Sequence, residues 1–335
     1  MQANTKLNHA TPSIPRMLGW LMASVTILSL PVQAQEARCR YVNLSEINFQ
    51  VTQNQPLVEA KVNQNSGQFL LSTGATQSAI FSDFAEKTGL ALKHTTKTKA
   101  GIGGYTRNYT TLIESMSIGK IKGERLKFPV LKQDLVPTNI AGILGSDFLL
   151  RHDIEIDWSK SVLRFFHPEN CAPDAPLAYW DQDAIVVPLE IDAEQSPIIE
   201  VMLNGQKLRA RISSGSTATM VDLAHLKKSG IAFQQGEKLP DVSGIGENQM
   251  QAWRAQFDLL QIGTYQLAKP SFKVADFWGN LAKQDNTQKN ADSMRKNYQM
   301  VLGADFLRTH RVLFATSQKK LYFSAAPTTE QSEKP

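Results

Sequence analysis

Cysteine is scarce in this chain of 335 residues, which holds only two, Cys39 and Cys171. Neither lies in a C-x-x-C pair or beside a histidine at ligand spacing, so the sequence predicts no metal or redox site. In an oxidising compartment an even pair is more often bridged than free, and these two residues bracket one half of the chain. We therefore expect one intramolecular disulfide between them.

Long apolar runs are also lacking. Residues 17–30 form an apolar stretch of about 14 residues, shorter than the roughly 20 that a membrane helix needs. The stretch follows Lys6 and Arg16 and precedes Val32-Gln33-Ala34, an order typical of a secretory signal peptide. We expect residues 1–34 to be removed near Ala34 and the rest to be periplasmic or secreted, without a stable membrane span.

A strong charge of one sign is missing as well. Without residues 1–34 the chain holds 34 cationic and 31 acidic residues, a formal net charge of +3. The charges are scattered and form no basic stripe with interleaved aromatics, so the sequence predicts no nucleic-acid partner. The composition, with 42% hydrophobic and 20% charged residues, is typical of a globular protein.

What the sequence does contain is an internal repeat. Residues 57–92 align with residues 198–233 without a gap, and the alignment superimposes Ser72 on Ser213. Three blocks recurring in the same order indicate a duplication. The other two blocks are GIGG at 101–104 with GIGE at 244–247, and residues 141–166 with 299–324.

Each copy consists mainly of segments of strand length, with one short helix that ends at Gly89 or Gly230. Many short strands and glycine turns predict an all-β fold of two β-barrel-like lobes around a central cleft. The polar residues 276–297 in the second copy predict a surface loop. The predicted domains are an N-terminal lobe (35–170), a linker (171–185), a C-terminal lobe (186–325) and a disordered tail (326–335).

The repeated blocks resemble the retropepsin-like aspartic peptidases. That family carries D-[TS]-G-[AS] after a strand, then a glycine hairpin, then two hydrophobic residues and glycine before D-F-L. Two copies in one chain are similar to the pepsin-type bilobal arrangement. The matching residues are Leu71-Ser72-Thr73-Gly74-Ala75 and Ile212-Ser213-Ser214-Gly215-Ser216, followed by Ile143-Leu144-Gly145 and Val301-Leu302-Gly303.

The chain departs from this family at its two catalytic positions, where Ser72 and Ser213 stand in place of aspartate. The supporting residues remain. The resemblance implies that Thr73 and Ser214 lock the two loops together, that Gly74 and Gly215 allow the tight turns, and that the glycine hairpins are flaps over an extended peptide. The flap residues implied are Gly103, Gly104 and Tyr105 in the first copy and Gly246 in the second.

Aspartic peptidase chemistry needs two carboxylates that share one proton, and a serine hydroxyl replaces neither of them. The resemblance therefore implies an inactive peptide- or protein-binding homologue without a cofactor, and we expect a monomer. One alternative is an aspartic endopeptidase in which the two aspartates have been altered to serine. Another is a serine-dependent hydrolase, which needs a histidine base that neither motif has nearby in sequence.

Five further acidic residues invite a functional interpretation. Asp147 and Asp305 follow the hydrophobic-glycine elements, and we expect them to cap the helix turn that comes next. Asp153, Glu155 and Asp157 alternate along a strand, which predicts a solvated strand face rather than a cation site.

Overall fold

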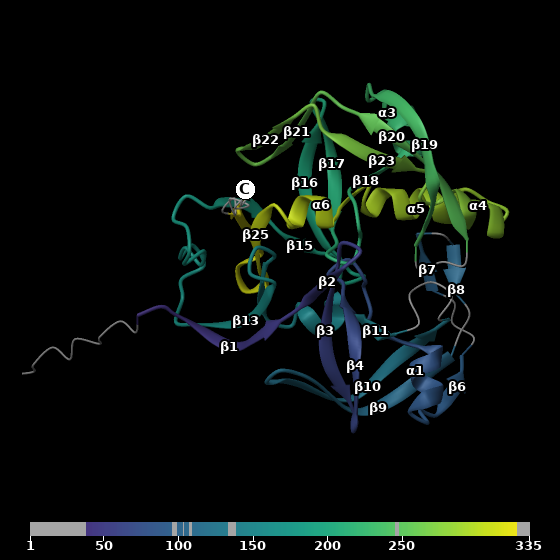
Figure 1. Cartoon of the computed structure of the whole chain (residues 1–335). Coiled ribbons are helices and arrows are strands. Elements are labelled where there is room, and N and C mark those ends of the chain that lie inside the picture. Colours follow the sequence, from purple (N-terminus) through teal and green to yellow (C-terminus); the bar gives the residue numbers. More distant parts are fainter. Residues whose placement is uncertain are drawn as a thin grey trace, which may run out of the picture. The chain divides into compact units, whose positions relative to one another are not determined.

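The computed structural model describes residues 38–95, 99–102, 104–106, 109–132, 139–244 and 248–326. The predicted signal peptide (1–34), Gly103, Gly246 and residues 327–335 of the predicted tail lie outside these ranges. The described chain is all-β with a few short helices, as predicted, and its strands form four sheets (Figure 1). Within the described residues, no helix is long and apolar enough to cross a membrane.

The first copy folds into an eight-stranded sheet that closes on itself through a pairing between β3 and β9. Helix α1 (Ser82–Lys87) packs against it, and the chain leaves the helix through Gly89, whose φ of +68° suits glycine. The strands in spatial order are β2 (Gln50–Thr52), β3 (Gln55–Val62), β4 (Asn65–Leu71), β11 (Ile140–Leu144), β5 (Ala79–Phe81), β10 (Ile121–Leu131), β9 (Tyr109–Ile118) and β6 (Leu92–His94).

The second copy repeats this arrangement in a ten-stranded sheet. In both copies the four middle strands are joined by a parallel, an antiparallel and a parallel pairing, in that order. Helix α3 (Leu223–Ser229) is closed by Gly230, which has a positive φ like Gly89 after α1. The strands in order are β19 (Gln234–Ser243), β20 (Gln249–Gln256), β23 (Ser271–Ala275), β18 (Met220–Asp222), β24 (Met300–Leu302), β17 (Gln206–Ile212), β16 (Pro197–Leu203), β21 (Leu259–Ile262) and β22 (Tyr265–Ala268), with β15 (Glu190–Ile191) beside β16.

A third sheet of six strands draws on both halves of the chain, and the sequence analysis did not predict it. Its centre is the antiparallel pair β12–β25, in which Ile154 lies opposite Phe314. The order is β1 (Arg40–Asn48), β13 (Val162–Glu169), β12 (Asp153–Asp157), β25 (His310–Ala315), β26 (Lys320–Ala325) and β14 (Ile185–Pro188). The two lobes therefore share a continuous hydrogen-bonded platform.

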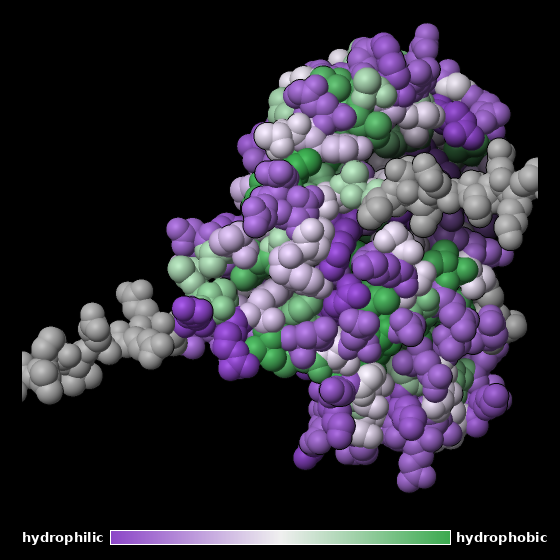
Figure 2. Space-filling view, turned by 60° about the vertical axis from the view of Figure 1, so that its left-hand side comes forward, coloured by the Kyte–Doolittle hydropathy of each residue, from purple (hydrophilic) through white to green (hydrophobic). Residues whose placement is uncertain are grey.

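The core follows from the alternation of apolar and polar residues along the repeated strands. Alternate residues of β3 and β16 are buried, and the buried positions correspond under the repeat. They are Val58, Ala60 and Val62 in the first copy and Ile199, Val201 and Leu203 in the second. On the face drawn in Figure 2, hydrophilic residues predominate and hydrophobic ones are scattered, as expected when most large apolar residues are buried in the core.

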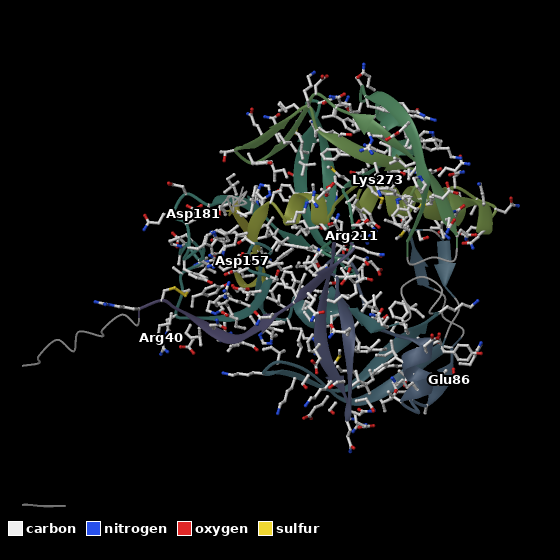
Figure 3. The ribbon with its side chains drawn as sticks, viewed as in Figure 1. Arg40, Glu86, Asp157, Asp181, Arg211 and Lys273 are labelled. Atoms are coloured by element: carbon white, nitrogen blue, oxygen red, sulfur yellow. A yellow bond between two sulfur atoms is a disulfide. The ribbon has the colours of Figure 1, made fainter. Side chains whose placement is uncertain are left out.

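The expectation of a solvated face on β12 is wrong, because Asp153, Glu155 and Asp157 are all buried in the six-stranded sheet. Glu155 accepts hydrogen bonds from Arg164 at 2.5 Å and from Arg311 at 2.9 Å. These partners come from neighbouring strands of the sheet and supply the compensation that buried charge requires. Figure 3 shows Asp157 inside this sheet.

The expected disulfide is present. Cys39 and Cys171 are bonded, with their Cα atoms 4.3 Å apart, and the bond closes a loop with a sequence separation of 132. It joins the chain just before β1 to the segment just after β13, close to Arg40 (Figure 3).

Replacing Cys39 and Cys171 together with serine is expected to lower the free energy of unfolding by about 3–5 kcal/mol, because a long loop in the unfolded chain regains its freedom. Denaturant unfolding of the oxidised chain and the variant measures this difference. Equal midpoints and slopes for the two proteins would contradict a stabilising role.

Candidate functional site

The two serines of the repeat stand at equivalent points, each just after a central strand. Ser72 follows β4 and donates its backbone N–H to Leu144 at 2.9 Å, and Ser213 follows β17 and donates to Leu302 at 2.9 Å. Each serine is 6% exposed. The parallel neighbouring strands β11 and β24 thus fix where the two hydroxyls lie.

Four hydrogen bonds join the two serine loops across the lobe boundary. The Thr73 hydroxyl donates to the carbonyl of Ile212 at 3.0 Å, and the Ser214 hydroxyl donates to that of Leu71 at 2.7 Å. Each of these hydroxyl oxygens also accepts the backbone N–H of the other residue, at 3.0 and 3.1 Å. Both side chains are fully buried, so the bonds lie away from competing water.

The two glycines permit this close approach. A Cβ at Gly74 would overlap the Ser213 side chain and lie 3.1 Å from its Cα, and a Cβ at Gly215 would overlap the Ser72 side chain. Each glycine therefore faces the serine of the other copy. The structure places Ser72, Thr73, Gly74 and their repeat equivalents in one reciprocal cluster, the loop pair.

Asp147 and Asp305 bind the chain segment that follows each serine loop. Asp147 accepts the backbone N–H and the hydroxyl of Ser78, both at 2.7 Å, and Asp305 accepts the corresponding groups of Thr219 at 2.8 and 2.6 Å. Helices α2 (Ser146–Leu149) and α6 (Ala304–Leu307) have no side-chain N-cap. Asp147 therefore does not cap its helix as expected, whereas Asp305 also accepts the first-turn N–H of Phe306 at 2.9 Å. Both carboxylates brace the chain that follows each serine loop.

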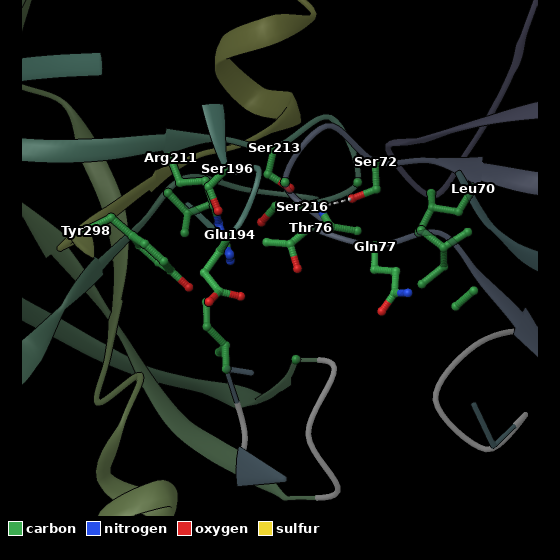
Figure 4. Close-up of a pocket in the computed structure, with 18 of the residues that line it drawn as sticks. Leu70, Ser72, Thr76, Gln77, Glu194, Ser196, Arg211, Ser213, Ser216 and Tyr298 are labelled. Atoms are coloured by element: carbon green, nitrogen blue, oxygen red, sulfur yellow. Dashed lines mark hydrogen bonds between the residues drawn. The ribbon is translucent and has the colours of Figure 1, made fainter. Parts of the chain in front are cut away.

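A cavity of about 260 Å³ opens beside the loop pair and is lined by both serines. Figure 4 shows Arg211 and Tyr298 on one side of it and Leu70 and Gln77 on the other. These four lining residues were not among the predicted site residues. The alternation of side chains along a strand could have predicted Arg211, because Arg211 lies two residues before Ser213 and therefore on the same side of the strand.

The segment 276–297 forms one wall of the cavity, so the prediction of a surface loop is wrong. It folds into two helices, α4 (Gly279–Gln284) and α5 (Lys289–Asn297). Trp278, Met294 and Asn297 line the cavity. Arg295 anchors the segment through ion pairs to the buried Asp222 at 2.8 Å and to Asp276 and Asp292 at 3.0 Å.

The hairpins that were assigned as flaps approach one another. Gly104 and Tyr105 lie in β8 (Gly104–Thr106), which pairs with β7 (Lys99–Gly101), and β8 lies against α4. Ile102 is buried among apolar residues of the second copy, and a Cβ at Gly244 would overlap its carbonyl. Gly103 and Gly246 fall outside the described residues.

Neither serine hydroxyl has an acid or base beside it in the part of the chain that the structure describes. Ser72 Oγ accepts the backbone N–H of Ala75 at 3.2 Å, and no described histidine or carboxylate hydrogen-bonds it or Ser213. His310 instead stacks on Phe306 with ring centroids 4.3 Å apart. Among the described residues no group of histidine, cysteine and acidic side chains is arranged to hold a metal ion.

The model of the aspartyl protease family matches residues 58–148 and 199–306, more than half of the chain. The two matched regions are the two copies of the repeat, and each contains one serine loop. The chain therefore belongs to the aspartyl protease family, with two tandem copies of its domain. No curated protein sequence matches it.

Proposed function

We propose that this chain is an exported aspartic peptidase homologue that binds extended peptides or protein segments between its lobes without hydrolysing them. One observation carries the proposal. The loop pair is fully assembled by cross-lobe hydrogen bonds, yet it presents the hydroxyls of Ser72 and Ser213 where the family's chemistry needs carboxylates.

The chemistry supports inactivity. In the family mechanism one carboxylate takes a proton from water while the other, protonated, polarises the peptide carbonyl. A serine hydroxyl is too weak an acid to act as that base near neutral pH, and it does not carry the negative charge of the pair. The two hydroxyls have the capacity to hold a water molecule by hydrogen bonds, but not to activate it.

The remaining scaffold supports peptide binding. The cavity is bordered by strand ends and by the first hairpin, and an extended peptide is recognised by backbone hydrogen bonds to such edges together with pockets for alternate side chains. Export is supported by the signal-peptide pattern of residues 1–34 and by the Cys39–Cys171 disulfide, which suits an oxidising compartment. Because both loops of the site belong to one chain, we propose a monomer.

An active aspartic endopeptidase with aspartate at both positions is the second candidate function. The observation that favours it is that the glycines, the cross-lobe hydroxyls and the braces at Asp147 and Asp305 all persist around the two serines. A serine-dependent hydrolase has less support, because it requires a base beside one of the hydroxyls.

The proposal is tested by giving the purified mature chain a library of labelled peptides across acidic to neutral pH. We expect a subset of peptides to bind, detected by fluorescence anisotropy, and no new amino termini by mass spectrometry after prolonged incubation. Cleavage that persists after separate replacement of Ser72 and Ser213 with alanine would indicate a contaminating peptidase. Cleavage lost in either variant would overturn the inactive assignment, and failure of every peptide to bind would overturn the binding function.

A further inference from the structure

The two sides of the cavity differ in charge although they derive from the same repeat. Other positions that line the cavity in both copies of the repeat carry no charge in either copy, such as Ala79 with Met220 and Ile143 with Val301. The exception is the position two residues before each serine, which is Leu70 in the first copy and Arg211 in the second. A single guanidinium therefore stands on one side of the site.

Leu70 lies on an uncharged side of the cavity, which it shares with Gln77 (Figure 4). It packs in a cluster with seven other buried hydrophobic residues, among them Phe81 and Leu131, which also line the cavity. A ligand side chain on this side of the serines meets no charged partner there. Burial of an apolar side chain is the interaction that this half of the cavity favours.

Arg211 is held in the opposite half without an ionic partner. Its guanidinium carbon lies 4.1 Å from the ring centroid of Tyr298. Arg209, two residues earlier in β17, pairs with Glu190 at 2.8 Å, whereas Arg211 forms no such pair within the described part of the chain, and its Nε is buried without an acceptor. A buried donor without an acceptor is unfavourable, so a ligand that supplies one is favoured.

The described surroundings of Arg211 supply no ion pair to its guanidinium. Burial raises the pKa of Tyr298 to about 12, so this ring stays neutral at physiological pH. Trp278 lines the same half of the cavity, and its Nε1 is a second buried donor without an acceptor among the described residues. Two acids also line the cavity, and neither forms an ion pair with Arg211. Glu194 is exposed to solvent, which screens its charge, and Asp192 accepts the backbone N–H groups of Glu194 and Ser196.

We propose that the half of the cavity formed by Arg211, Tyr298 and Trp278 is a subsite for a ligand carboxylate, while the half around Leu70 takes an apolar side chain. The inference rests on the proposed peptide-binding function and specifies the peptide: an acidic and an apolar residue on opposite sides of the serine pair. The carboxylate comes from an aspartate or glutamate side chain or from the carboxyl terminus of the ligand chain. Arg211 is then the specificity-determining residue of the site.

The test uses fluorescein-labelled peptides with blocked termini in which phenylalanine adjoins glutamate or glutamine, in both orders, between alanine and serine residues. We expect one glutamate peptide to bind about 10- to 100-fold more tightly than its glutamine counterpart, as a hydrogen bond to a charged group implies. A peptide without acidic side chains that ends in a free carboxylate, compared with its amide, distinguishes the two sources of the carboxylate.

Arg211→Leu installs the residue of the first copy and is expected to abolish the glutamate preference, so that the glutamate and glutamine peptides bind with similar affinity. Arg211→Gln, which keeps a polar side chain and removes only the charge, is expected to do the same. The matched control is Arg254→Leu, because Arg254 lies in an exposed ion pair with Glu237 in the same lobe. Circular dichroism and the unfolding midpoint check that each variant folds.

Equal affinity for glutamate and glutamine peptides, or a preference that survives in folded Arg211→Leu, overturns the subsite while the peptide-binding function stands. Failure of all the peptides to bind overturns both, because the subsite then has no ligand. A preference lost equally in Arg254→Leu would mean a general effect of positive charge, and it would also overturn the assignment to Arg211.

Discussion

Changing Ser72→Asp and Ser213→Asp together is expected to produce endopeptidase activity with an acidic pH optimum, while the chain as given and either single change remain inactive. The cross-lobe bonds of Thr73 and Ser214 already join the two loops, and each serine lies against the glycine of the other copy. Two carboxylates act as a unit, so restoring one of them supplies no proton-sharing partner. The acidic optimum follows because close carboxylates do not both ionise.

A digest of casein or a peptide library compares the four proteins across acidic to neutral pH. The matched control is the double change to asparagine, which has the shape of aspartate but does not ionise, and which we expect to be inactive. Absence of cleavage by a folded double aspartate variant would show that the cleft has diverged beyond the two serines. Activity in the asparagine protein would contradict the requirement for a carboxylate pair.

Replacing Glu155 with alanine is expected to destabilise the chain by about 3–5 kcal/mol, the usual cost of breaking a buried ion pair by removing one partner. Glu155 is fully buried and is the shared acceptor for Arg164 from the first half and Arg311 from the second. It also accepts the hydroxyl proton of Tyr179 at 2.7 Å, and burial together with this carboxylate raises the pKa of Tyr179 to about 12. Without Glu155 the two guanidinium groups keep only the longer contacts to Asp157, at 3.8 Å, as a shared ionic partner in the sheet.

Denaturant unfolding of the wild-type chain and the variant measures the change. The control is Glu46→Ala, which removes an exposed carboxylate paired with Arg164 at 2.6 Å. Because the Glu46 side chain is 51% exposed, the pair is screened by water, and we expect a loss below about 1 kcal/mol. Similar losses for Glu46→Ala and Glu155→Ala would contradict the view that Glu155 joins the two halves.

The sequence by itself determined the repeat, the all-β class, the short helices ending at Gly89 and Gly230, and the Cys39–Cys171 disulfide. Each of these features can be recognised in a short segment or in a pair of residues: strands by their periodicity, helix ends by a glycine that tolerates positive φ, and the disulfide by the even number of cysteines. The residues of the loop pair were predictable for the same reason, because they form a contiguous motif that occurs twice. The signal peptide and two flap glycines stay predictions, because they lie outside the described residues.

Tertiary structure alone decided the six-stranded sheet, the burial of Asp153, Glu155 and Asp157, and the placement of 276–297 against the cavity. A charged residue that alternates along a strand has the same local pattern whether water or a distant arginine faces it. Arg311, which compensates Glu155, lies more than 150 residues away in the chain, and only the pairing of β12 with β25 brings it there. Such pairings depend on how whole sheets pack, and the periodicity of a single segment does not determine which strand will pair with it.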